Sequence, residues 1–154
     1  MYVGGFTLDD VELDFEILRE PWNKYSLKDG AYLKSRFVLL KVKKQAVPAT
    51  VTETKIGFAF EGKNLNVMYV VPAELKGNPS KTRFSIEELS RAKKEEVGYV
   101  PISEDWNEYV LEEGTTLRLK STVVGVSRSD KIDRNGDPIY FIQNSQTLGI
   151  KPRK

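Results

Sequence analysis

The same strand-forming pattern occurs twice in this sequence, 84 residues apart, and this repeat limits the fold more than any other feature. Residues 21–42 read PWNKYSLKDGAYLKSRFVLLKV, and residues 105–126 read DWNEYVLEEGTTLRLKSTVVGV. The matched pairs are Trp22/Trp106, Asn23/Asn107, Tyr25/Tyr109, Leu27/Leu111, Gly30/Gly114, Leu33/Leu117 and Val42/Val126, with Glu20/Glu104 upstream. Both tryptophans of the chain share this register, which chance rarely arranges. The sequence therefore predicts an internal duplication.

A weaker match follows each copy, at an offset of 80 residues. Its pairs are Phe60/Tyr140, Asn64/Asn144, Met68/Leu148, Val70/Ile150 and Pro72/Pro152. We expect repeat one to cover 11–72 and repeat two to cover 99–152, with 73–98 as connector and helix. A sheet of about 55 residues buries little apolar surface by itself. We therefore expect the repeats to share one core in a single compact domain, 1–154.

The repeat unit is predicted to be β-structure because its apolar and polar residues alternate. Across residues 24–28, tyrosine and leucine alternate with lysine and serine, the period-two pattern of a strand with one buried face. Gly30 and Gly114 follow, each preceded by an acidic residue, and glycine accommodates the positive φ of a tight reversal. Residues 37–40 and 122–126 are apolar on both sides, so we expect these strand ends to be buried on two faces.

One helix is predicted, over residues 85–97. Ser85 and Glu88 form a capping-box pattern, in which each side chain accepts a hydrogen bond from the other residue's backbone N–H. Gly98 is a natural helix stop. We therefore expect a mainly β fold: a pseudo-two-fold β-barrel or β-sandwich with one α-helix packed on it.

The chain has neither cysteine nor histidine, which excludes several kinds of chemistry. Disulfides, thiol nucleophiles, Cys/His zinc sites and histidine acid/base catalysis all need these residues. No glycine-rich phosphate loop or serine-nucleophile motif occurs. An EF-hand reading of 131–142 fails because Lys131 occupies the first ligand position. We expect no enzymatic activity, no cofactor and no metal site.

The apolar pattern and the first residues of the sequence predict where in the cell the protein is located. The longest purely apolar run, 67–71, is far shorter than the roughly 20 residues of a membrane span. The first residues do not resemble a secretory leader. We therefore expect a cytoplasmic protein without membrane contact. The lack of cysteine, the two methionines and the dense charge of both signs are typical of thermophiles.

The Trp-Asn-x-Tyr motif supports two interpretations. In the first, Trp22 with Tyr25 and Trp106 with Tyr109 stack bases or grip a peptide. In the second, the tryptophans fill the core where a strand enters it, and the asparagines hold the turn. A duplicated fold has to fill equivalent positions twice, so we favour the structural role.

Basic residues gather on the two long strands of the repeats. Residues 21–52 contain seven Lys or Arg and one acidic residue, and such a face suits a phosphate backbone. Residues 11–18 carry alternating acids, so this strand could instead lie beside the basic one and pair charges across the sheet. The whole chain has a net charge of only +2, which is weak for a dedicated nucleic-acid binder.

These observations predict a non-catalytic macromolecule-binding β-module that acts in a multiprotein or ribonucleoprotein assembly through charged strand faces. A protein partner or self-association is favoured, with the acidic strand of one subunit against the basic hairpin of another. The alternative is direct binding of single-stranded RNA or DNA by the basic hairpin 32–44 with aromatic stacking. The candidate partner-binding residues are Lys34, Arg36, Lys41, Lys43, Lys44, Arg118, Lys120, Trp22, Tyr25, Trp106 and Tyr109.

Overall fold

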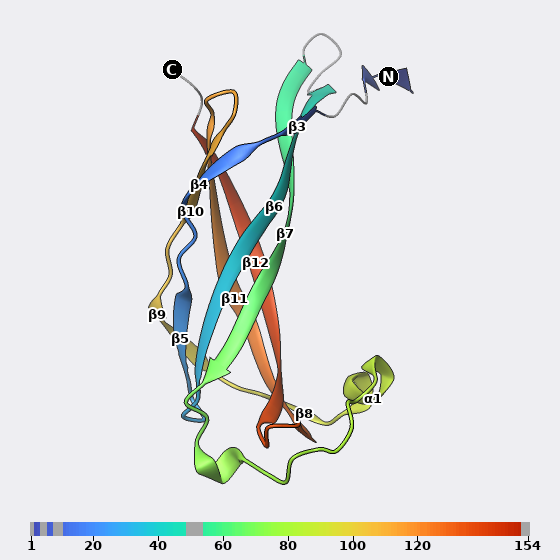
Figure 1. The fold of residues 1–154 in the computed structure, drawn as a ribbon, viewed down its shortest axis with the longest axis vertical. Coiled ribbons are helices and arrows are strands. Elements are labelled where there is room, and N and C mark those ends of the chain that lie inside the picture. Colours follow the sequence, from blue (N-terminus) through green and yellow to red (C-terminus); the bar gives the residue numbers. More distant parts are fainter. Residues whose placement is uncertain (1, 4–5, 8–10, 49–53, 152–154) are drawn as a thin grey trace.

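The computed structural model describes residues 2–3, 6–7, 11–48 and 54–151, and it is mainly antiparallel β-structure (Figure 1). The strands are β1 (Tyr2–Val3), β2 (Phe6–Thr7), β3 (Val11–Leu13), β4 (Phe15–Arg19), β5 (Asn23–Leu27), β6 (Tyr32–Pro48), β7 (Thr54–Tyr69), β8 (Lys94–Glu96), β9 (Tyr99–Ser103), β10 (Asn107–Leu111), β11 (Thr116–Ile132) and β12 (Pro138–Lys151). A 3-10 turn, η1 (Ala73–Leu75), and one helix, α1 (Ile86–Arg91), lie between β7 and β8. The prediction of a mainly β fold is confirmed.

Two five-stranded sheets are each built on one long hairpin. In the first sheet, β6 pairs with β7 along its length, and its other edge pairs with β5 and then with β3. In the second sheet, β11 pairs with β12 in the same way, and with β10 and then β8. Strands β9 and β4 complete the first and second sheets by pairing with β5 and β10. The small β1–β2 pair forms a separate sheet.

Two chain segments cross from one sheet to the other. The first arm, residues 11–19, pairs with β6 through β3 and then with β10 through β4. The second arm, residues 94–103, pairs with β11 through β8 and then with β5 through β9 (Figure 1). Each repeat therefore supplies a strand to the sheet of the other repeat.

The pairings of the two sheets have the same register at the 84-residue offset. Val11 lies opposite Lys44, and Glu95 opposite Arg128. The register shift after Leu39 in β6 has its counterpart after Val123 in β11. Up to Lys44 and Arg128, the registers and this irregularity are the same in the two sheets, so corresponding positions can be compared residue by residue; a second shift, between Arg128 and Ile132, occurs in β11 alone.

The predicted offset of 80 for the last strand of each repeat is wrong. Phe60 lies opposite Val42 and Ile142 lies opposite Val126, so β7 and β12 correspond at an offset of 82. A shift of two residues keeps every side chain on its face of the sheet, so the apolar pattern alone could not detect it. Pro152, the last residue of that comparison, lies outside the described residues.

Of the two architectures that the sequence left open, a β-barrel or a β-sandwich, the described part of the structure does not form a closed barrel. Among the described residues, no strand pairing joins the first sheet to the second. Strand pattern reveals which face of a strand is buried but not which strand is its neighbour, so closure could not be read from the sequence.

Two hydrophobic clusters lie between the sheets, and each contains residues of both repeats. The first consists of Leu13, Phe37, Leu39, Val42, Tyr109, Leu111, Leu117 and Leu119. The second consists of Tyr25, Leu27, Ala31, Leu33, Val97, Val123 and Val126. Apart from Phe37 and Leu119, every member of the first corresponds to a member of the second at the 84-residue offset. Neither repeat completes a cluster by itself.

Two polar triads lie near the middle of the long strands. Ser35 donates to Asn66 (2.7 Å), Asn66 donates to Asn144 (2.8 Å), and Asn144 donates back to Ser35 (3.2 Å). The second triad joins Ser121, Asn64 and Gln146 at 2.9–3.3 Å. Each triad links β7 to β12, so hydrogen bonds join the two hairpins where the sheets share no strand pair.

The helix prediction is right at its start and wrong at its end. Both hydrogen bonds of the Ser85–Glu88 capping box are present, at 3.0 and 3.1 Å. The helix ends at Arg91, contains no buried residue, and is followed by β8. Pairing of β8 with β11, and burial of Val97 in the second cluster, outweigh the local helix preference of residues 92–97. In the described ranges, no helix has the length and apolar character that crossing a membrane requires.

Candidate binding face on the first sheet

The outer side of the first sheet carries the most distinctive group of side chains. On β6, Leu33, Ser35 and Phe37 point between the sheets and are buried, so the alternating residues point outward. Cross-strand pairing adds outward residues of β5 and β7 beside them. We call this surface the Lys24 face, and it consists of Trp22, Lys24, Tyr32, Lys34, Arg36, Lys63, Leu65, Val67 and Tyr69.

The corresponding surface of the second sheet is the Glu108 face. It consists, in the same order, of Trp106, Glu108, Thr116, Arg118, Lys120, Ser145, Thr147, Gly149 and Lys151. The correspondence follows from the equal registers, with an offset of 84 up to the long strands and 82 on β7 and β12. The two faces of this one chain can therefore be compared position by position.

Each tryptophan lies on its face, against two cations of the neighbouring strand. The Lys34 ammonium is 4.8 Å from the centroid of the Trp22 ring, and the Arg36 guanidinium carbon is 5.9 Å from it. On Trp106 the corresponding cations, Arg118 and Lys120, are at 4.4 and 5.9 Å. Both tryptophans are half-buried, and neither belongs to a hydrophobic cluster. The interpretation that they fill the core is therefore wrong.

Tyr25 and Tyr109, in contrast, are completely buried. Their hydroxyls donate hydrogen bonds of 2.6 Å to the carboxylates of Glu104 and Glu20. Burial, and then the neighbouring carboxylate, raises the pKa of each tyrosine well above its usual value. No partner can stack on these two rings in this structure. The match of Glu20 with Glu104 was the sequence signal for these contacts.

The basic residues at the far end of β6 pair with acids of the same chain. Lys41 lies 3.8 Å from Glu12, and Lys44 donates a hydrogen bond of 2.6 Å to Glu113. The Lys44 hydrogen bond is the main cause that lowers the pKa of Glu113. Lys43 lies opposite Glu12 in the β3–β6 ladder. The expected charge pairing between the acidic and basic strands thus occurs within one chain.

Lys24 and Lys34 lie directly opposite each other on β5 and β6, and this is the main charge difference between the faces. At the corresponding place, Glu108 lies opposite Arg118, and the two form an ion pair at 3.8 Å. No carboxylate within the described part of the chain pairs with Lys24 or Lys34. Arg36 contacts the buried carboxylate of Glu20 at 3.3 Å.

Apolar residues mark a second difference between the faces. On β7, Leu65 and Val67 are 42% and 41% exposed, next to Arg36 and Lys34 respectively. Their counterparts on the Glu108 face are threonine and glycine. Tyr32 and Tyr69 stack at 5.7 Å with an interplanar angle of 29°. The Lys24 face thus combines unpaired cations with exposed apolar and aromatic surface, which the Glu108 face does not.

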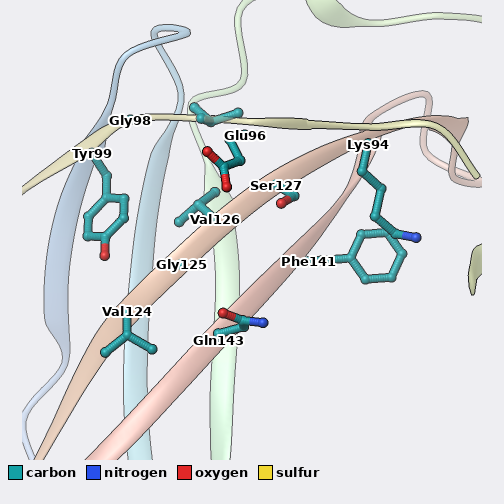
Figure 2. A pocket seen from close by; sticks show the side chains of 11 residues that line it. Lys94, Glu96, Gly98, Tyr99, Val124, Gly125, Val126, Ser127, Phe141 and Gln143 are labelled. Atoms are coloured by element: carbon teal, nitrogen blue, oxygen red, sulfur yellow. The ribbon is translucent and has the colours of Figure 1, made fainter.

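A hollow of about 560 Å³ lies elsewhere, where β8, β11 and β12 meet (Figure 2). At the edge of the hollow, the Lys94 ammonium lies 4.7 Å from the centroid of the Phe141 ring. Figure 2 shows Glu96 and Gln143 on other sides of the hollow. Gly125 leaves space where the corresponding residue of repeat one is Lys41. Tyr99 and Ser127 also line this hollow, which was not predicted from the sequence.

Comparison with protein-family models, with curated proteins and with solved structures gave no match for this chain. Within residues 11–48 and 54–151, no three His, Cys, Asp or Glu side chains are grouped so as to hold a metal ion. Of the predicted binding residues, the structure brings Trp22, Lys34 and Arg36 together on the Lys24 face. It places Trp106, Arg118 and Lys120 on the Glu108 face. Lys24, Lys63, Leu65 and Val67 were missed.

Proposed function

We propose that this protein is a non-catalytic β-module that binds a polyanionic macromolecule on the Lys24 face. The observation that carries the proposal is the position of Lys24 opposite Lys34. Like charges directly opposite in a sheet are destabilising. The corresponding pair in the second sheet, Glu108 with Arg118, indicates that this place in the fold accommodates an acid. An anionic partner would supply the missing counter-charge.

The arrangement of the cations favours an extended partner over a small anion. Lys24, Lys34 and Lys63 come from three neighbouring strands, and Arg36 lies next to Lys34 on the outward side of β6. These side chains lie on the outer side of a sheet and do not surround a cavity. A chain of anionic groups can contact several of these cations at once.

The proposal assigns different roles to the two repeats. We propose that the fold is a pseudo-two-fold β-sandwich that arose by duplication. Repeat two would complete both hydrophobic clusters, and its outer face would keep an acid, Glu108, where the Lys24 face has a lysine. Repeat one would carry the binding face.

Self-association within a protein assembly is a second candidate function. Its support is the edge strand β4, where Ile17 and Leu18 are 54% and 52% exposed. At the position of Ile17, the other arm has Pro101, a residue that protects a sheet edge from pairing. A monomer at high concentration and low salt would rule out this candidate. The acidic-strand scheme does not support it, because Glu12 and Lys41 already pair within the chain.

Titration with long-chain inorganic polyphosphate tests the main proposal. Trp106→Phe leaves Trp22 as the only tryptophan, and displacement of Lys34 and Arg36 from its ring should change its emission. We expect affinity to fall with salt, and Lys24→Glu to weaken binding about tenfold or more. Lys120→Glu makes the same charge change on the Glu108 face and should weaken it about threefold or less. No binding at about 50 mM salt, or equal losses in the two variants, would overturn the proposal.

A further inference from the structure

We infer that the polyanion is single-stranded nucleic acid, with its phosphates on the cations of the Lys24 face and its bases on the apolar and aromatic residues beside them. This inference rests on the proposed function and identifies the class of partner. Apolar and aromatic side chains lie beside the cations of the Lys24 face, and binding of a polyanion by its charge alone would not require them.

Cations and apolar residues alternate across the Lys24 face in a way that the strand pairings define. Lys24, Lys34 and Val67 lie in one row across β5, β6 and β7, and Arg36 and Leu65 lie in the next. On the other side of the first row lie Tyr32 and Tyr69. Lys34 and Arg36 therefore each have an apolar neighbour on β7 at about 5 Å, the distance between strands, and Lys24 lies next to Lys34.

Exposed apolar surface favours a single strand over a duplex. A duplex offers phosphates and grooves to a sheet face, but its base faces are stacked inside. A single strand exposes base faces, which stack on aromatic side chains and cover aliphatic ones. Leu65 and Val67 are each more than 40% exposed, so a ligand that covered them would remove apolar surface from water. Phosphate contacts alone would not do this.

The Glu108 face lacks the apolar and aromatic part of this arrangement, and it has an acid in place of Lys24 and a serine in place of Lys63. It has threonine and glycine in place of Leu65 and Val67, threonine in place of Tyr32, and lysine in place of Tyr69. It keeps its tryptophan with two cations, so this motif alone does not distinguish the faces. The residues that differ between the faces are therefore the ones that would cover bases and neutralise a phosphate backbone.

The length of the face limits the site. Tyr32 to Val38 spans six residue steps of β6, or about 20 Å. This matches a short segment, close to the smallest single-strand sites of about four nucleotides. We therefore expect affinity to stop rising once an oligonucleotide covers the face once.

The test compares polyanions that differ in whether they expose base faces. Full-length protein is titrated with four 12-unit probes: oligo-dT, an abasic oligonucleotide, a DNA duplex and polyglutamate. We expect oligo-dT to bind at least about tenfold more tightly than the abasic strand, because base stacking adds to the phosphate contacts. Trp22 emission in Trp106→Phe should change with oligo-dT.

A double variant, Leu65→Thr with Val67→Thr, isolates the base contacts. We expect its oligo-dT affinity to fall to that of the abasic strand, with abasic affinity unchanged. Val124→Thr with Leu18→Thr is the matched control, because it removes two exposed aliphatic side chains outside the Lys24 face. Thermal unfolding of each variant confirms that it is folded.

The outcomes separate this inference from the proposed function. Equal affinity for oligo-dT and the abasic strand, or tighter binding of the duplex or of polyglutamate, overturns the inference. If Lys24→Glu still weakens polyphosphate binding more than Lys120→Glu does in that case, the proposed function stands. Absence of binding to every polyanion overturns both.

Discussion

The hydroxyl of Tyr109 donates a hydrogen bond of 2.6 Å to the carboxylate of Glu20, which lies 89 residues earlier in the chain. Glu20 follows the first arm directly, and only 2% of its side chain is exposed. It also accepts hydrogen bonds from the backbone N–H of Leu39 and from Arg36. The corresponding bond joins Tyr25 to Glu104, just after the second arm. These two bonds attach the end of each arm to the opposite repeat.

Tyr109→Phe removes the hydroxyl and keeps the ring, and it should therefore destabilise the protein. The buried carboxylate of Glu20 would lose one of its donors, and hydrogen bonds to charged groups contribute about 1.5–3 kcal/mol. Urea denaturation at neutral pH measures the free energy of unfolding. Tyr32→Phe, on the outer side of the sheet, is the control and should change it by less than about 0.5 kcal/mol. Equal effects would show that the Tyr109–Glu20 bond has no special role.

Acid should destabilise the protein through Asp29, whose side chain is 9% exposed. Burial tends to raise the pKa of this carboxyl. Hydrogen bonds from Tyr140, the Ala31 N–H and Arg128 outweigh burial, so the pKa lies below its usual value. A lowered pKa gives stability that is complete above the unfolded pKa of about 3.9 and is lost as pH falls through the folded pKa.

The measurement is urea denaturation from pH 7 to pH 2.5 for the native chain and for Asp29→Asn. We expect Asp29→Asn to be less stable at pH 7 and to lose less stability below about pH 4, so the two curves converge. Curves that stay parallel would mean that Asp29 does not contribute to the acid transition.

Gly62 should not tolerate a methyl group. It lies opposite Leu39 at the irregularity of the β6–β7 ladder. A Cβ atom there would collide with the Phe37 ring and with the Val38 carbonyl oxygen, which is backbone and cannot move aside cheaply. Gly62→Ala should therefore cost about 1–3 kcal/mol or more.

Gly149→Ala is the matched control for Gly62→Ala. A Cβ atom at Gly149 would meet no atom closer than 3.7 Å, an ordinary contact distance. Thermal or urea unfolding should show little loss for this variant. Similar losses for both glycines would contradict the steric explanation.

Local features of the sequence predicted local structure well. Gly30 and Gly114 adopt φ of 96° and 100°, as a tight reversal requires. The Ser85 capping box forms as predicted. The arm exchange could not be predicted, because the alternation of residues 11–18 indicates a buried face but not which sheet that strand joins. The end of the helix depended on the same missing information about neighbouring strands.

The candidate site was predicted only in part for a similar reason. Lys34 and Arg36 were identified because they match Arg118 and Lys120. Lys24 was missed, because its interest depends on lying opposite Lys34 across the sheet. A residue-by-residue comparison of the copies would have shown lysine against glutamate at this position. Leu65 and Val67 were missed because an apolar residue in a strand is expected to point toward the core, and only the structure shows that these two are exposed.

Lys24→Glu should make the free protein more stable, although it weakens binding. The change places an acid opposite Lys34, as Glu108 lies opposite Arg118. Replacing a repulsive cross-strand pair by an attractive one should add about 0.2–1 kcal/mol to the free energy of unfolding. Glu108→Lys creates the repulsive pair on the other face and should lower it by a similar amount. Both effects should shrink in 1 M NaCl, where the Debye length is about 3 Å. If Lys24→Glu instead destabilises the free protein, Lys24 has a structural role, and the charge imbalance of the Lys24 face no longer points to a partner.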